Sequence, residues 1–362
     1  MSTTKHKKRL IIDLSILRHL YCGLGQVAWN FGKCFETYFQ PQPNLEVCLL
    51  VPPRFVGTFG HNVRYIKYHH ILRMLYHQTP CLVLPHFDLW HAIFQNALFP
   101  YQMGGKMLLT IHDLNFLYEK SDKAEHSKRL ERLQRRIDKA AHIVCISNYT
   151  ITDVQKYVQV HNKPLSLIYN GVEIIDPSNE RQPIFAQIGQ RFFFSIGEVR
   201  PKKNFHTIVE MMKHMPDYQL YIAGNKSTEY AQQIQKIIAN KDIKNAHLIG
   251  FIAPEERTWL YHHCSAFLFP SLFEGFGLPI IEAMQFGKPV CISRSTSLPE
   301  IGGKHAFYWD NFEPEAMAQT VQTAIQTMND TQRVEQEIAY ARTFSYQHNF
   351  EQYLNIYLNL LR

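Results

Sequence analysis

The fold is decided by the stretch Phe269-Pro-Ser-Leu-Phe-Glu274-Gly-Phe-Gly-Leu-Pro279-Ile-Ile-Glu282-Ala-Met284. An apolar run that ends at Phe269 predicts a buried strand, and Pro279 suits the first turn of a helix. The loop between them therefore joins a strand to a helix whose free N–H groups favour an anion such as a diphosphate. We expect Glu274 in the loop and Glu282 in the first helical turn, where their carboxylates accept hydrogen bonds from hydroxyl groups.

The two glutamates have a second interpretation, because a single carboxylate at this position is an ordinary helix cap. Here, however, two of them flank a Gly-x-Gly sequence that precedes a proline. Gly275 and Gly277 also allow the backbone to approach a ligand closely. The combination favours a binding loop over a cap.

The first half of the chain repeats the same strand-to-helix pattern. Short apolar runs bounded by turn residues are typical of buried parallel strands, and helical periods separate them. The alternation predicts an α/β domain with helices on both faces of its sheet. The expected strands cover residues 10–14, 45–51, 107–111, 143–146 and 165–169, and the expected helices include residues 26–39 and 123–141.

The pattern restarts after a polar, proline-containing stretch at residues 176–183, which we interpret as a linker. The sequence thus predicts two α/β domains, 1–175 and 176–345. An amphipathic helix within 346–362 closes the chain, and we expect it to pack back toward the first domain. Expected strands cover residues 192–196, 219–223, 247–249, 266–269 and 289–292, and expected helices cover residues 205–214, 230–239 and 254–263.

Composition sets limits on the class of protein. The 362 residues suit two domains, and 46% hydrophobic with 19% charged residues is typical of a globular chain. The formal net charge of +7 suits phosphate-bearing ligands or an anionic membrane surface. No nucleic-acid-binding motif is present, so we expect no nucleic-acid partner.

The cysteines and the apolar runs predict where the protein works. The seven cysteines are scattered and form no C-x-x-C, which indicates reduced thiols packed as small hydrophobic residues. Asp13 interrupts the apolar run that follows the basic start, so this run does not resemble a signal peptide. No apolar run reaches the roughly 18 residues that span a bilayer. We expect a cytoplasmic protein, or one peripheral to the inner face of a membrane.

The string E-G-F-G-L-P-x-x-E-A-M, from Glu274 to Met284, resembles the paired-glutamate motif of glycosyltransferase family 4. The resemblance implies the GT-B fold, with two Rossmann-like domains facing a cleft, and sugar transfer from a nucleotide-sugar donor. It makes Glu282 the acceptor of ribose hydrogen bonds and Glu274 a catalytic contact of the transferred sugar. The other donor-binding residues that it implies in this loop are Gly275, Phe276, Gly277 and Leu278.

A basic turn follows the first expected strand of the second half, in Ser195-Ile-Gly197-Glu-Val-Arg200-Pro-Lys202-Lys203-Asn204. Its position at a strand end favours binding of a diphosphate over a solvated turn, most firmly for Lys203 and less so for Lys202. The family commonly has Arg-Lys here and arginine in place of Glu198. Lysine lacks the bidentate fork of arginine, so how much Lys202 and Arg200 each contribute to binding the diphosphate stays open.

Two segments of the first half also resemble the family. Gly23 and Gly25, in Tyr21-Cys-Gly23-Leu-Gly25-Gln, are similar to its N-terminal glycine loop, although Gly-x-Gly alone is common in tight turns. Leu109-Thr-Ile-His112-Asp113-Leu resembles the segment with its active-site histidine. The resemblance implies that His112 contacts the transferred sugar and that Asp113 fixes the loop.

We expect neither a cofactor nor a metal ion. The chain has no Asp-x-Asp triplet, and the adjacent histidines His69-His70 and His262-His263 should point apart on a helix. The expected diphosphate clamp is Lys203 with its neighbours. The family further implies retention at the anomeric carbon, by a front-face mechanism.

The segment Ile-Ile-Asp13-Leu-Ser resembles a subgroup associated with mannosyl transfer. We therefore expect GDP-mannose as donor, with UDP-sugars second, and a glycan or lipid-linked acceptor in surface polysaccharide or lipopolysaccharide synthesis. The rival interpretations are a nucleotide-sugar epimerase and an inactive sugar-binding scaffold.

The expected helix 123–141 is basic and could rest on anionic lipid. A solvated charged face is the competing interpretation, because Glu125, Glu131 and Asp138 are interspersed. The cations are Lys128, Arg129, Arg132, Arg135, Arg136 and Lys139.

Overall fold

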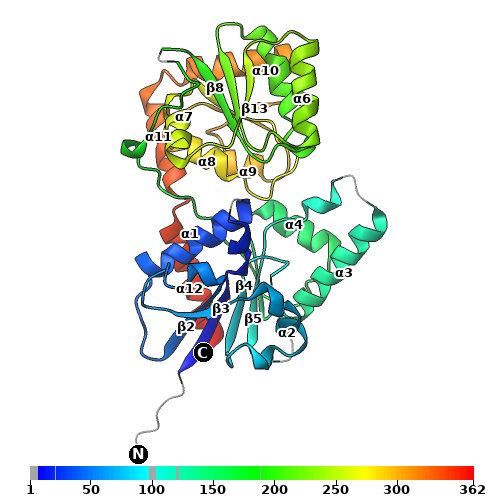
Figure 1. The fold of residues 1–362 in the computed structure, drawn as a ribbon, viewed down its shortest axis with the longest axis vertical. Helices are drawn as coiled ribbons and strands as arrows, with labels where there is room; N and C mark the ends of the chain where they lie inside the picture. Colours follow the sequence, from blue (N-terminus) through cyan, green and yellow to red (C-terminus); the bar gives the residue numbers. More distant parts are fainter. Residues whose placement is uncertain (1–6, 21, 98–102, 120–121, 188) are drawn as a thin grey trace, which may run out of the picture. The chain divides into compact units, whose positions relative to one another are not determined.

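The computed structural model describes residues 7–20, 22–97, 103–119, 122–187 and 189–362. The chain forms two compact units (Figure 1). Unit 1 comprises Met1–Gly171 and Ser345–Arg362, and unit 2 comprises Val172–Phe344. The expected linker, residues 176–183, lies in unit 2, where the main-chain N–H of Arg181 donates to the Glu255 carbonyl at 3.0 Å.

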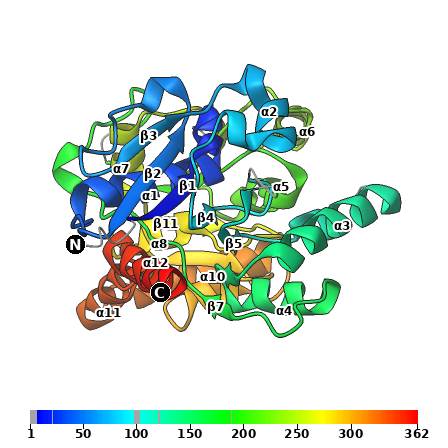
Figure 2. The same cartoon turned by 90° about the horizontal axis from the view of Figure 1, so that it is seen from below.

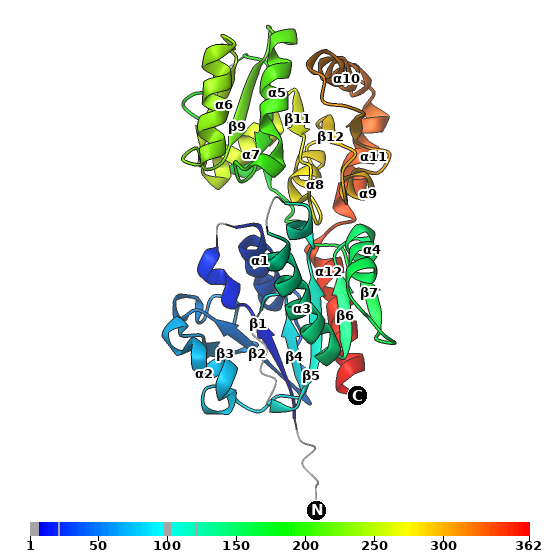
Figure 3. The same cartoon turned by 90° about the vertical axis from the view of Figure 1, so that its right-hand side faces the viewer.

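Unit 1 contains a parallel sheet in the order β3-β2-β1-β4-β5-β6-β7. Figure 3 shows β1, β4 and β5 side by side. The strands are β1 (Lys8–Asp13), β2 (Leu45–Val51), β3 (Arg64–Lys67), β4 (Leu89–Ala92), β5 (Lys106–Ile111), β6 (His142–Cys145) and β7 (Leu165–Leu167). All five expected strands are confirmed. The sequence analysis missed β3, a short strand that is not fully buried, and β4, whose apolar run is broken by His91.

Unit 2 contains a second parallel sheet in the order β10-β9-β8-β11-β12-β13. Its strands are β8 (Phe192–Ile196), β9 (Gln219–Ala223), β10 (Ala246–Gly250), β11 (Ala266–Phe269), β12 (Val290–Ser293) and β13 (Phe307–Trp309). The five expected strands are confirmed, and the three-residue β13 was missed. In both units the strand order reverses beside the first strand, which is where parallel sheets of this kind bind ligands.

Helices connect these strands, and none among the described residues is both long and apolar enough to cross a membrane. Unit 1 contains α1 (Gly23–Thr37), α2 (Arg73–Gln78), α3 (Lys123–Lys139), α4 (Asn148–Tyr157) and α12 (Tyr346–Leu361). Unit 2 contains α5 (Phe205–Met211), α6 (Glu229–Asn240), α7 (Pro254–His263), α8 (Leu278–Met284), α9 (Leu298–Gly302), α10 (Pro314–Thr327) and α11 (Thr331–Arg342).

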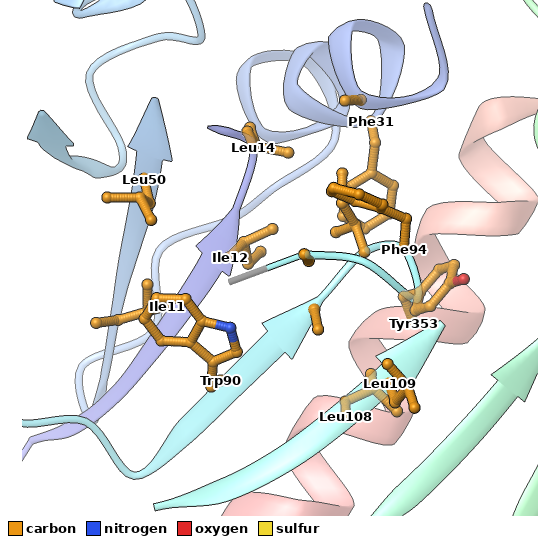
Figure 4. Close-up of a cluster of buried hydrophobic side chains, with 14 of the residues drawn as sticks. Ile11, Ile12, Leu14, Phe31, Leu50, Trp90, Phe94, Leu108, Leu109 and Tyr353 are labelled. Carbon is orange, nitrogen blue, oxygen red and sulfur yellow. The ribbon is translucent and has the colours of Figure 1, made fainter. Parts of the chain in front are cut away.

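The closing helix α12 packs against the core of unit 1, and Figure 4 shows its Tyr353 among the buried side chains. Its Tyr353 hydroxyl lies 3.0 Å from Thr110 Oγ1, and its Tyr357 hydroxyl lies 2.7 Å from His91 Nδ1. His91 Nε2 in turn lies 2.9 Å from Thr110 Oγ1. Buried hydroxyl and imidazole groups thus satisfy one another, and they join α12 to β4 and β5.

Two expectations about side chains need correction. Arg136 of α3 does not belong to a solvated basic face, because it is buried and its Nη1 donates to the Ala97 carbonyl at 2.6 Å. All seven cysteines are free, but only five are buried, whereas Cys22 and Cys81 are exposed.

Candidate active site

The candidate site of unit 2 lies where its strand order reverses, between β8 and β11. These two strands pair directly, so the loops at their carboxyl ends are neighbours. The β8 loop carries Lys203 and the β11 loop carries Glu274. Lys203 Nζ forms an ion pair with Glu274 Oε1, and only 12% and 15% of these side chains are exposed. The structure therefore brings together two residues that the sequence analysis assigned to different parts of the donor.

Several hydroxyl groups hold the Glu274 loop in place. Ser271 Oγ donates to Glu274 Oε1 at 2.5 Å. The main-chain N–H of Glu274 donates to Thr296 Oγ1 at 3.0 Å, and Ser297 Oγ donates to the Glu274 carbonyl at 3.0 Å. Glu274 is thus held at its side chain, its main-chain N–H and its carbonyl, a pre-organised arrangement that suits binding of a ligand hydroxyl.

The glycine before α8 sets where that helix begins. Gly277 has φ of 102°, and a Cβ there would lie 2.9 Å from Leu298 Cδ2, so other residues are disfavoured. Because Gly277 is the N-cap, α8 begins at Leu278, not at Pro279, and Glu282 falls beyond the first turn, contrary to our expectation. Gly275 and Phe276 are buried beside it.

Glu282 is held by two residues of the neighbouring helix α7. Tyr261 donates its hydroxyl hydrogen to Glu282 Oε2 at 2.7 Å, and Arg257 Nη1 lies 3.9 Å from Glu282 Oε1. The carboxylate raises the pKa of the Arg257 guanidinium, and burial raises the pKa of Tyr261 well above its usual value. Both neighbours therefore keep their protons, so the Glu282 carboxylate has a hydroxyl donor and a cation as its partners.

The basic turn after β8 forms the short helix η8 (Pro201–Lys203). A Cβ on Gly197, whose φ is 159°, would lie 3.2 Å from Lys203 Cε, so this glycine makes room for the lysine stem. Lys203 Nζ also lies 4.7 Å from the centre of the Phe269 ring. Arg200, in contrast, pairs with Glu198 at 2.6 Å on the exposed surface, and the Lys202 carbonyl accepts a bond from Leu272.

In unit 1, His112 follows β5 and is only 5% exposed. Its Nε2 lies 2.8 Å from the Ile93 carbonyl oxygen, which can only accept, so Nε2 carries the proton. Burial lowers the pKa of the ring to about 4. The imidazole is therefore neutral near pH 7, and its unprotonated Nδ1 can accept a hydrogen bond but the ring supplies no positive charge. Asp113 Oδ1 accepts from the Asn115 N–H at 3.0 Å, which holds the following turn.

The glycine loop of unit 1 differs from a simple strand-to-helix turn. The helix η1 (Ser15–His19) separates β1 from α1, and α1 begins at Gly23 with Cys22 as its N-cap. A Cβ on Gly25 would lie 2.2 Å from the His19 carbonyl oxygen, so protein packing itself requires this glycine. Gly23 has open space around it. Tyr21 lies outside the described residues.

The adjacent histidines of α7 do not point apart, which corrects our expectation. His262 Nδ1 lies 2.9 Å from Glu180 Oε2, and His263 Nε2 lies 3.0 Å from Glu180 Oε1. Adjacent residues on a helix do not face each other along its surface, but two at its end can still bind the same side chain of another segment, here that of Glu180. Glu180, His262 and His263 have ligand-type atoms within 4.8 Å of one another, but they satisfy each other by hydrogen bonds.

Two family models match the chain. The model of glycosyl transferases group 1 matches residues 177–342, and the model of Glycosyltransferase Family 4 matches residues 34–175. The first match contains Lys203, Glu274 and Glu282, and the second contains His112.

Similar curated proteins include O-antigen mannosyltransferases. The O-antigen chain mannosyltransferase RfbU of Salmonella typhimurium is 28% identical over 206 residues, which are 55% of each chain. The O-antigen chain mannosyltransferase B of Escherichia coli is 25% identical over 283 residues, 72% of each chain. The serotype-specific mannosyltransferase WbdA of Escherichia coli is 29% identical over 180 residues, 46% of this chain and 22% of that protein. The chain thus spans about half of the first relative and under a quarter of WbdA.

Solved structures share the fold over nearly the whole chain. HepE of Anabaena, in complex with UDP and glucose, has a TM-score of 0.72 at 19% identity, with 98% of this chain and 100% of that chain covered. Sucrose-phosphate synthase of Thermosynechococcus elongatus has a TM-score of 0.75 at 15% identity, with 98% and 99% covered. Together with the two family models, these likenesses show that the chain belongs to glycosyltransferase family 4, with the GT-B fold of two Rossmann-like domains.

Proposed function

We propose that this glycosyltransferase moves mannose from GDP-mannose to a glycan or lipid-linked acceptor in the synthesis of a surface polysaccharide, with retention and without a metal ion. The observation that carries the proposal is the ion pair of Lys203 and Glu274 beside the reversal of strand order in unit 2. The O-antigen mannosyltransferases among the relatives support the choice of donor and product class.

In the proposed mechanism, three side chains of unit 2 take different parts of the donor. Glu282, held by Tyr261 and Arg257, accepts hydrogen bonds from the ribose hydroxyls. Lys203 turns from Glu274 to the diphosphate and neutralises the charge that grows there, with Lys202 beside it. Glu274, released from the lysine but still held by its loop, accepts a hydrogen bond from the transferred sugar.

The transfer step needs no residue of the chain as a nucleophile. The bond between the anomeric carbon and the diphosphate oxygen breaks, and the bond to the acceptor oxygen forms on the same face. The acceptor proton passes to the leaving phosphate. We propose that Nδ1 of neutral His112 accepts one hydrogen bond from a hydroxyl of the transferred sugar, and that Gly23 and Gly25 line the approach of the donor phosphate and the acceptor.

A UDP-sugar is the second candidate donor, and one observation favours it: HepE, whose fold is similar, has been solved in complex with UDP-glucose. Melting curves with GDP-mannose, UDP-glucose, GDP and UDP test the choice. A ligand at 100 times its Kd stabilises the folded protein by about 2.7 kcal/mol, which is a shift of several degrees. We expect the shift with GDP and GDP-mannose, and its loss in Glu282→Ala. A melting shift with UDP and UDP-glucose alone would show that the donor is a UDP-sugar and not GDP-mannose.

Products formed from the donor alone distinguish a transferase from an epimerase and from an inactive scaffold. A transferase slowly hydrolyses GDP-mannose to GDP and mannose when no acceptor is supplied. An epimerase instead converts the donor to its epimer, and an inactive scaffold leaves it unchanged. We expect slow hydrolysis, with the α-anomer released first because configuration is retained.

We also propose that the protein works at the cytoplasmic face of a membrane. The exposed cations of α3, which include Lys128, Arg132 and Arg135, would lie near anionic lipid. A lipid-linked acceptor would then lie within reach of the enzyme.

A further inference from the structure

Unit 1 presents large apolar side chains to solvent on three consecutive short helices. These are η3 (His70–Leu72), α2 and η4 (Pro80–Leu82). Ile71 is 95% exposed, Met74 is 66% exposed and Leu82 is 72% exposed. Large apolar side chains that are this exposed and this close together in the sequence are typical of an interaction surface.

The structure holds these side chains outward by burying the opposite side of the segment. Tyr76 of α2 is buried, and its hydroxyl donates to the Lys67 carbonyl at 2.9 Å and accepts from the His69 N–H at 3.3 Å. The Tyr76 ring also lies against Tyr68, with ring centres 4.9 Å apart. Ile71 and Met74, three residues apart, share the outer side of the helix.

The segment that carries these apolar side chains is basic. Residues 47–87 contain no aspartate or glutamate. Lys67 and Arg73 are exposed within this segment. The basic helix α3 is close as well: burial lowers the pKa of His77 in α2, and the charges of Arg73 and Arg136 lower it further. Figure 2 shows α3 with one end projecting from the rest of unit 1.

We propose that η3, α2 and η4 form a membrane-docking surface whose apolar side chains enter the headgroup region of an anionic bilayer. Apolar residues that penetrate the interface, surrounded by cations that bind lipid phosphates, are the chemistry of interfacial helices. A bilayer fits this charge pattern better than a protein partner, because the exposed Lys67 and Arg73 accompany the apolar residues and residues 47–87 contain no acidic residue to set a register. The inference rests on the proposed membrane location and names the surface responsible for it.

The exposed Cys81, next to Leu82, offers a direct test. In a Cys22→Ser background, where serine preserves the N-cap of α1, Cys81 is the exposed thiol for an environment-sensitive fluorophore. We expect its emission to shift to shorter wavelength with vesicles that contain phosphatidylglycerol, and not with phosphatidylcholine alone. No shift with either vesicle, or an equal shift with both, would overturn the proposal.

Substitutions then locate the surface by sedimentation of unlabelled protein with the same anionic vesicles. Replacing Ile71, Met74 and Leu82 together by serine should weaken binding by at least about 100-fold, since each buried apolar side chain contributes about tenfold or more. The matched control replaces the exposed Ile184 and Phe251 of unit 2 by serine and should bind like the parent. If the triple variant sediments with the vesicles like the parent, the surface does not dock on lipid. The same holds if the substitutions dissociate a dimer of the protein without weakening its binding to vesicles.

A measurement away from the membrane separates this inference from the proposed function. The triple variant should keep the GDP-mannose melting shift and the slow donor hydrolysis of the parent. If lipid binding follows the prediction while both donor assays fail in the parent, the donor assignment is wrong and the docking surface stands. If donor assays succeed and the triple variant still binds lipid, the docking surface is wrong.

Discussion

The ion pair of Lys203 and Glu274 predicts that each partner can be removed only at a cost in stability. Both side chains are less than one sixth exposed, so a single substitution leaves the other charge buried without its partner. Breaking a buried pair in this way costs about 3–5 kcal/mol when the site is dry, and we expect about 2–3 kcal/mol here because some water reaches it. Glu274→Ala should cost less than Lys203→Ala, since the Phe269 ring still faces the lysine.

The same pair predicts opposite effects on nucleotide affinity. In the parent, a diphosphate competes with Glu274 for Lys203. Glu274→Ala removes the competitor and should tighten GDP binding about 3- to 10-fold, whereas Lys203→Ala removes the ligand's partner and should weaken it by about tenfold or more. Turnover should fall in both variants, because in the proposed mechanism Glu274 contacts the sugar and Lys203 stabilises the leaving group.

Urea denaturation and titration calorimetry with GDP measure both effects. The double variant Lys203→Met with Glu274→Leu should lie within about 1 kcal/mol of the parent, since no charge remains buried. Lys241→Ala is the matched control, because it breaks the more exposed pair with Glu210 and should cost about 1 kcal/mol or less. Equal losses of GDP affinity in Glu274→Ala and Lys203→Ala would refute the competition, and additive stability losses in the double variant would refute the pairing.

Four further outcomes follow from the site and from the fold. Sugar transfer should persist in excess EDTA. Activity that EDTA abolishes and one divalent ion restores would contradict the lysine clamp. The double variant His262→Ala with His263→Ala is the control for an ion bound at Glu180. Glu282→Ala should weaken GDP and GDP-mannose alike in calorimetry, and Tyr261→Phe should do so to a smaller extent because it removes only one bond to that carboxylate. His112→Ala should leave GDP affinity unchanged and lower the turnover number about 100-fold; transfer at the parent rate would make the histidine purely structural. Burial raises the pKa of Glu337 in α11 to about 9, so the folded protein keeps this proton while the unfolded chain loses it near pH 4.5. The free energy of unfolding therefore falls as the pH rises between these values, by up to about 1.4 kcal/mol per pH unit. Glu337→Met should flatten that dependence in melting curves recorded at about pH 5 and pH 8.

The sequence predicted the parts of the fold whose signal is local. Parallel strands buried on both faces appear as short runs of branched apolar residues, and most of the strands were found in this way. Strand β4 was missed because His91 interrupts its run. That histidine is tolerated at the centre of a sheet because Tyr357, which lies 266 positions further along the chain, meets its Nδ1. A partner so distant in sequence leaves no local pattern.

The candidate site shows the same division. Lys203 and Glu274 were predicted because each follows a strand end, and all three residues, including Glu282 in α8, belong to strings that resemble the family. Arg257 and Tyr261 were missed, although they hold Glu282, because α7 looks like any helix with a partly buried side. Their spacing of four residues places both on one side of α7, which is a signal only once Glu282 is known to lie opposite.

The residues that hold Glu274 and Glu282 also explain why the two glutamates should play different roles. Glu282 has a phenol and a guanidinium of α7 as partners, and these contacts exist whether or not a ribose is bound. Glu274 is paired with Lys203, and in the proposed mechanism that lysine is the group that binds the diphosphate. Donor binding therefore changes the surroundings of Glu274 far more than those of Glu282. A carboxylate whose partner is exchanged on binding suits the transferred sugar, whose charge changes during the reaction, and a carboxylate with permanent partners suits the ribose, which does not react.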